Sequence, residues 1–155
     1  MFRDKSLFIL YVLAALANIF NFVGHGGWGI SGKVAFADLV TKSLSSVFGI
    51  SMSTETALPI VQAIGWVDVA LAVVMALALI GIWTGRGLLA KLARSRIMVV
   101  IFAWAIFWGL ATAFSRVTAS NFEPLYILDF IERGGNYFGG AISFYLTLLL
   151  RRQDN

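Results

Sequence analysis

Cysteine is absent from the 155-residue sequence, and histidine occurs only once, at His25. Without cysteine the chain cannot form a disulfide bond, a thiolate metal site, an iron–sulfur centre or a thiol nucleophile. A single histidine excludes a bis-histidine haem and multi-histidine metal centres, and leaves open only a single axial haem ligand. No serine has the elbow motif of a hydrolase. We therefore expect no metal site, no intrinsic cofactor and no catalytic activity from this chain alone.

Charged residues are also scarce, at 13% of the chain, whereas hydrophobic residues make up 59%. The sequence further contains 13 phenylalanines, 5 tryptophans and 4 tyrosines. Soluble domains average about 25% charged residues, and a soluble domain of this size could not bury so much apolar surface. The composition therefore indicates an integral membrane protein.

Four apolar stretches are long enough to cross a bilayer, whose core requires about 20 residues of helix. They lie at about 6–25, 58–83, 96–115 and 127–150, and the third carries no charge from Ile97 to Ser115. The sequence predicts an all-α, polytopic membrane protein in which four transmembrane helices form a bundle. We expect one integral membrane domain over residues 1–155, with an outer loop at 26–57.

Basic residues determine the expected orientation, because cytoplasmic loops are enriched in lysine and arginine. The larger basic group lies on one side of the predicted bundle and consists of Arg3, Lys5, Arg86, Lys91, Arg94, Arg96, Arg151 and Arg152. The smaller group consists of Lys33, Lys42, Arg116 and Arg133. We therefore expect a multi-pass protein of a bacterial inner membrane, with both termini and the 84–95 loop in the cytoplasm. This topology also accounts for the net charge of +4 without any nucleic-acid partner.

The stretch "FVGHGGWGISGKVAF" at residues 22–36 contains a near match to a phosphate-binding loop, G-x-x-x-x-G-K, from Gly27 to Lys33. Such a loop joins a strand to a helix, and a serine or threonine after the lysine holds magnesium. Here a predicted transmembrane helix comes first, and Val34 follows the lysine. We therefore expect no nucleotide at this segment.

The same stretch is rich in glycine, which allows the chain to leave the first span in a turn. Beyond it, apolar residues recur at helical spacing, namely Phe36, Val40, Leu44, Val47 and Phe48. Polar residues occupy much of the other side. The pattern favours an amphipathic helix on the outer membrane surface, and an ordered loop is the alternative.

Polar residues inside a span are costly and usually face the protein interior. All four predicted spans direct such residues toward the outward half of the bundle, namely Asn18, Asn21, His25, Gln62, Asp68, Arg116, Asp129, Glu132, Arg133 and Asn136. On the first and fourth spans their spacing places them on one helical face. Asp68 lies roughly 15 Å into the second span at the helical rise, near mid-membrane.

Two interpretations of these polar residues remain open. In one they form an internal network that fixes helix packing, with Asp68 bonded to an arginine or asparagine and Asp129 paired with Arg133 one turn later. In the other they line an outward-facing chamber that binds a small molecule, a quinone head group or a lipid head group. Asp68 carries the most weight in both, because a carboxyl group near mid-membrane is costly.

The fourth span also contains a row of small residues at a spacing of four, Gly135, Gly139 and Ser143. Such a row allows another helix to approach closely, either inside the bundle or on a second protein. We therefore predict that these residues form a helix-packing interface.

Two segments resemble a known family: "GISGKVAF" after the first span, and the acidic second span with its Gly/Arg turn, "IGWVDVALAVVMALALIGIWTGR". In these segments the sequence resembles the DoxX-like family of small four-helix membrane proteins, over residues 6–115. That family is associated with membrane redox systems, including a subunit of a thiosulfate-oxidising quinone reductase. The resemblance implies a small subunit or accessory protein of a quinone-linked redox complex, with other membrane subunits as partners. The alternative is a stand-alone binder or carrier of a small lipophilic or acidic molecule in the outward chamber.

Overall fold

The computed structural model describes residues 4–132 and 134–152, and these ranges form seven helices and no strand. The helices are α1 (Lys5–Ile30), α2 (Val34–Phe48), α3 (Thr54–Thr84), α4 (Gly87–Ala93), α5 (Arg96–Ala119), α6 (Pro124–Glu132) and α7 (Gly134–Arg152). The all-α prediction is confirmed.

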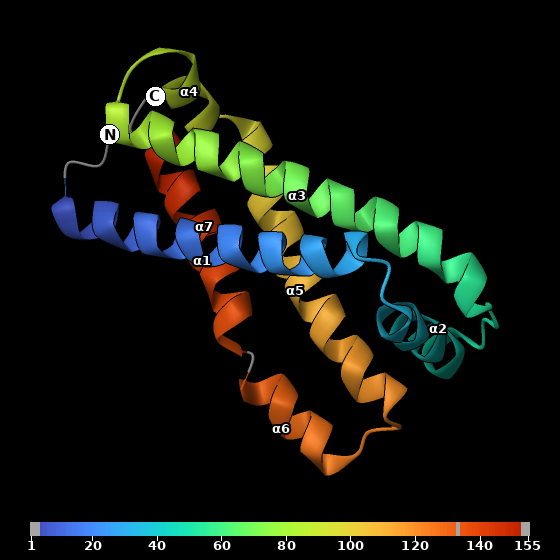
Figure 1. The fold of residues 1–155 in the computed structure, drawn as a ribbon. Helices are drawn as coiled ribbons and strands as arrows, with labels where there is room; N and C mark the ends of the chain where they lie inside the picture. The colour runs from blue at the N-terminus through green and yellow to red at the C-terminus, as the bar shows by residue number, and fades with distance from the viewer. Residues whose placement is uncertain (1–3, 133, 153–155) are drawn as a thin grey trace.

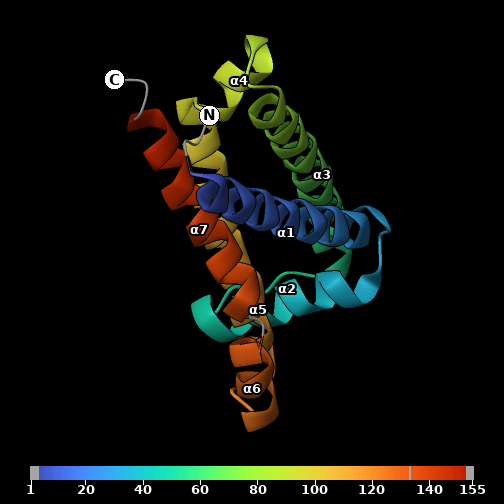
Figure 2. The same cartoon turned by 90° about the vertical axis from the view of Figure 1, so that its left-hand side faces the viewer.

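The long helices form two antiparallel pairs (Figure 1). Helix α1 packs against α3, α5 packs against α7, and α1 also contacts α7. Helix α2 runs across one end of the bundle, where it contacts α3 and α5 (Figure 2). The start of α1, the short α4 and the end of α7 lie at the opposite end in both views. Most of the basic residues with described positions are therefore gathered at one end.

Three of the described helices are long and apolar enough to cross a membrane: α1 with 26 residues, α3 with 31 and α5 with 24. They correspond to the first three predicted spans and support a membrane protein. The predicted fourth span at 127–150 is not one apolar helix in the described structure, because that range is divided between α6 and α7, and α7 is not among the three helices apolar enough to cross. The 19 residues of α7 begin with glycines and end with Arg151 and Arg152, which makes the helix less apolar.

Apolar side chains cover both the inside and the outside of the bundle. Tyr11, Phe22 and Phe102 are buried in the core, whereas Phe20 is 70% exposed and Trp66 is 63% exposed. Exposed apolar surface of this kind is unusual in a soluble monomer and is typical of contact with lipid. The exposed apolar faces of α1, α3 and α5 therefore indicate a membrane protein, as the composition does.

Helix α1 continues through the glycine-rich stretch, so the expected turn after residue 25 is wrong. Within residues 24–32, Gly32 is the glycine in the left-handed region, at φ +67°, and it follows the helix. Gly26 and Gly29 lie against Gly65 of α3: a Cβ added at Gly26 would be 2.8 Å from the carbonyl oxygen of Gly65. These glycines allow the two helix backbones to touch, as small residues do in membrane helix pairs.

The amphipathic helix predicted after the first span is present as α2. It ends at Gly49, which adopts the left-handed conformation, and buries Ala37 against α3. Its Asp38 accepts a hydrogen bond from the Thr54 hydroxyl at the start of α3. The Ser43 hydroxyl donates to the carbonyl oxygen of Ser115 on α5 at 2.6 Å. Helix α2 is thus fixed to two of the long helices and closes one end of the bundle.

Candidate functional site

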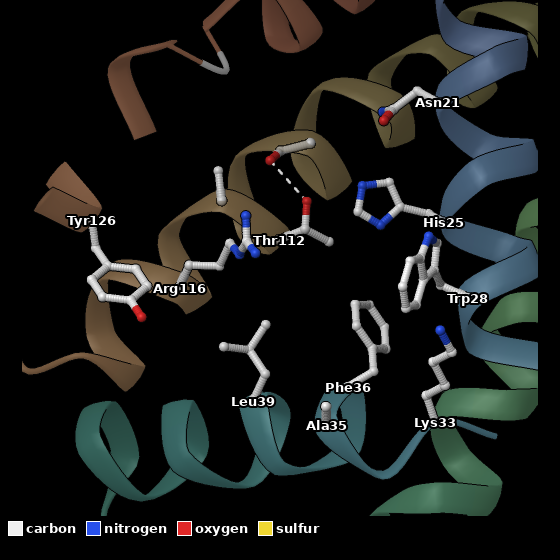
Figure 3. A pocket seen from close by; sticks show the side chains of 12 residues that line it. Asn21, His25, Trp28, Lys33, Ala35, Phe36, Leu39, Thr112, Arg116 and Tyr126 are labelled. Carbon is white, nitrogen blue, oxygen red and sulfur yellow. Dashed lines mark hydrogen bonds between the residues drawn. The ribbon is translucent and has the colours of Figure 1, made fainter. Parts of the chain in front are cut away.

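A cavity of about 450 Å³, here called the polar cavity, lies between α1, α2, α5 and α6. Figure 3 shows its side chains converging from these helices on a shared space. The described residues that line it are Asn21, His25, Trp28, Lys33, Ala35, Phe36, Leu39, Gly109, Thr112, Ala113, Arg116 and Tyr126. Among these residues, three were predicted from the sequence to face a chamber: Asn21, His25 and Arg116.

Local structure places each polar group of the cavity. Because α1 continues past residue 25, His25 is held on a helix rather than on a loop. Lys33 is the residue before α2, and its ammonium group lies 3.8 Å above the ring of Trp28, an arrangement that favours the cation. Arg116, in the last turn of α5, donates from Nη1 to Asp129 Oδ2 at 3.0 Å, which links α5 to α6. Tyr126 reaches the cavity from α6.

A second hollow of about 590 Å³, here called the apolar groove, lies between α2, α3 and α5. The residues that line it are Phe36, Leu39, Val40, Ser43, Leu44, Val47, Phe48, Val61, Ile64, Phe107, Trp108, Leu110, Ala111, Thr112, Phe114, Ser115 and Thr118. Phe36, Leu39 and Thr112 also line the polar cavity, so the two hollows adjoin. The Thr112 hydroxyl donates to the backbone carbonyls of Trp108 and Gly109, which satisfies its proton within α5.

Asp68 lies at the middle of α3 and is only 2% exposed. Trp108 of α5 donates its indole N–H to Asp68 Oδ2 at 3.1 Å. Among the described residues the partner is therefore an indole, and not the expected arginine or asparagine. Among the described residues none hydrogen-bonds to Asp68 Oδ1. Buried carboxyl oxygens are almost always paired, so this atom is an exception.

The other predicted polar residues serve contacts between helices. The Asn18 amide donates to Ser143 Oγ at 3.0 Å, which joins α1 to α7. Gln62 lies beside the turn at Gly32, where an added Cβ would be 2.9 Å from its amide nitrogen. Asp129 pairs with Arg116 in the described structure, and the expected Asp129–Arg133 pair stays a prediction. Arg133 and the side chains of Glu132 and Asn136 lie outside the described residues.

The predicted packing row on α7 faces α1 of the same chain. Ser143 is fully buried beside Asn18, and a Cβ added at Gly139 would meet Ala17 at 3.8 Å, which is an ordinary contact. Gly135 lies outside the residues whose surroundings are described. Among the α7 glycines whose surroundings are described, Gly140 has the closest neighbour: an added Cβ would be 3.1 Å from Ile106 of α5. Gly140 was not predicted to be a packing residue.

Several lining residues were missed from the sequence. Trp28, Thr112 and Tyr126 were not predicted to face a chamber, and Phe36 was assigned only to a helix on the membrane surface. The spacing of Phe36 and Leu39 on α2 is the one available signal, because it places both on the face that turns toward the bundle. Tyr126 carried no such signal, because its position depends on how α6 packs against α5.

A chamber rich in polar donors thus adjoins an apolar hollow, and the two share three lining residues. Comparison with protein-family models, curated proteins and solved structures finds no match for this chain.

Proposed function

We propose that this protein binds a small amphipathic molecule, with its polar part in the polar cavity and its lipophilic part in the apolar groove. A quinone and a lipid both have this division. The observation that carries the proposal is the shared wall of Phe36, Leu39 and Thr112, which brings hollows of about 450 and 590 Å³ into contact. Binding sites of this size, mostly apolar with a few convergent polar groups, are typical for small ligands.

The sequence-based hypothesis of a small subunit in a quinone-linked redox complex stays a prediction. Binding of an amphipathic molecule is compatible with it, because a subunit of such a complex would also meet quinones in the bilayer. We favour the binder or carrier, since the two adjoining hollows are formed within this single chain.

Filling the apolar groove tests this proposal. Ala111 lines the groove on α5, whereas Ala103 is an exposed residue of the same helix outside it. We expect Ala111→Phe to weaken binding of a decyl-tailed quinone at least about tenfold, the loss of roughly 1.4 kcal/mol of contact. Ala103→Phe should leave the affinity unchanged. Binding would be measured by titration calorimetry on protein in lipid nanodiscs, and equal effects of the two substitutions would rule out the groove.

We further propose that α7 is a fourth crossing and that both termini are cytoplasmic. Helix α7 packs against both α1 and α5, and its 19 residues extend roughly 28 Å at the helical rise, close to the thickness of the bilayer core. The polar cavity, α2 and α6 then lie on the outer side of the membrane.

Reporter fusions check this topology. Because basic residues gather at one end of the bundle, fusions after residues 90 and 155 should report a cytoplasmic location and one after residue 45 an external location. A C-terminal fusion that reports outside would exclude the fourth crossing, even if the fusions after residues 45 and 90 behave as expected.

A further inference from the structure

We propose that the polar cavity binds the acidic head group of its ligand, a carboxylate or a phosphate, and that this group competes with Asp129 for Arg116. The inference rests on the proposed function, because it specifies the chemistry of the head group that enters the polar cavity. It adds a residue outside the cavity lining, Asp129, as the group that limits affinity.

Cationic and donor groups reach the polar cavity from four elements (Figure 3). His25 lies on α1, Lys33 precedes α2 and Arg116 lies on α5, while Asn21 and Tyr126 add an amide and a phenol hydroxyl. None of the described residues that line the cavity is acidic. Hydrogen bonds from cationic donors to carboxylates and phosphates are stronger than neutral ones, so this set favours an anion over a neutral head group.

Asp129 already forms an ion pair with Arg116, although Asp129 does not itself line the cavity. The two side chains are 38% and 29% exposed, with 3.0 Å between Nη1 and Oδ2. An ion pair with this exposure contributes little net stability, because water and salt compete for both partners. A ligand carboxylate or phosphate can therefore replace Asp129 at Arg116. Asp129 thus acts as an internal competitor for the same guanidinium group.

The adjoining apolar groove distinguishes a lipid-like acid from a free anion. A free anion gains only the contacts of the polar cavity, whereas an acid with an alkyl chain also removes that chain from water. The structure therefore favours single-chain amphiphiles, either fatty acids or phosphate lipids, which share a negative head and an apolar tail.

Binding of radiolabelled compounds to the full chain in nanodiscs, against empty nanodiscs, tests the head group. Palmitate and single-chain phosphatidic acid should each bind at least about tenfold more tightly than hexadecanol, because the alcohol has the same chain without the charge. Acetate and inorganic phosphate should bind more weakly than either acid. If they bind as tightly as palmitate, the alkyl chain plays no part, and the preference for a lipid-like acid over a free anion is wrong.

Single substitutions test whether Asp129 competes with the acidic head group for Arg116. Asp129→Asn should raise the affinity for palmitate about threefold, while Glu123→Gln, an equal charge change on the exposed turn before α6, should not change it. Arg116→Gln should reduce palmitate binding to the level of hexadecanol. Lys33→Gln provides a second loss that leaves the pair of Arg116 with Asp129 intact, in case Arg116→Gln disturbs α6. Unchanged palmitate affinity in Asp129→Asn would contradict the competition.

The two proposals fail in different ways. If hexadecanol binds as tightly as palmitate, the acidic head group is wrong but binding of an amphiphile stands. If neither compound binds above the level of empty nanodiscs, the proposed function itself is wrong.

Discussion

Gly26→Leu is expected to lower the free energy of unfolding by about 3 kcal/mol or more, the upper range for overpacking a tight core. A Cβ at this position would lie 2.7 Å from Val69 Cγ2 and 2.8 Å from the backbone carbonyl oxygen of Gly65. The backbone of α3 cannot rotate away as a side chain can, so α1 and α3 must separate. Thermal unfolding of the purified protein in mild detergent, followed by circular dichroism, would measure the loss.

Gly27→Leu is the matched control, since Gly27 is the next residue of the same helix and an added Cβ there has no neighbour within 4 Å. Leucine is a better helix former than glycine by about 1 kcal/mol, so this variant should be as stable as the wild type or more stable. Equal stability of the two variants would show that α1 and α3 do not touch at Gly26.

The second large effect concerns the buried carboxyl group of Asp68. Trp108→Phe removes the indole that donates to Asp68 Oδ2, the hydrogen bond found for this carboxyl among the described residues. A buried polar group left without a partner costs about 1–3 kcal/mol. We expect Trp108→Phe to lose this amount, and the double variant Asp68→Val with Trp108→Phe to regain about 2 kcal/mol, because the carboxyl is then gone as well.

The comparison of the double variant with Trp108→Phe isolates the carboxyl group, since both contain the same smaller ring. Asp68→Asn with Trp108→Phe is the control, because it keeps a buried polar group of the same size and should regain little. Chemical denaturation monitored by circular dichroism would order the variants. If the double variant with valine is no more stable than Trp108→Phe alone, Asp68 has a partner that compensates for the lost indole.

Composition and periodicity were enough to predict the membrane class, the helical fold and α2. These depend on local sequence: a long apolar run forms a helix in lipid because its backbone groups must bond within the segment. The glycines of residues 24–29 were interpreted as a turn for the same local reason. The role of Gly26 and Gly29 depends on Gly65, almost forty positions away, which no local pattern reveals.

The site was predicted in part, and the errors share one cause. Asn21, His25 and Arg116 were identified because their positions on a helical face are local information. The pair of Asp129 with Arg116 was not predicted, because it joins two helices and the spacing along one helix does not reveal it. The pairing of Asp68 with Trp108 also joins two helices, so it too depends on how they pack.

The backbone contact between α1 and α3 has a mechanical consequence. Helices in direct backbone contact cannot slide or tilt independently without a clash, so α1 and α3 form one rigid unit. The hydrogen bond of Asn18 to Ser143, near the middle of α1, joins this helix pair to α7. The polar cavity lies on the C-terminal side of this hydrogen bond along α1, with α1 on one side and α5 and α6 on the other. Helix α2 ties the same end of the pair to α5, through Asp38 with Thr54 and Ser43 with Ser115, so the cavity has a rigid frame on both sides.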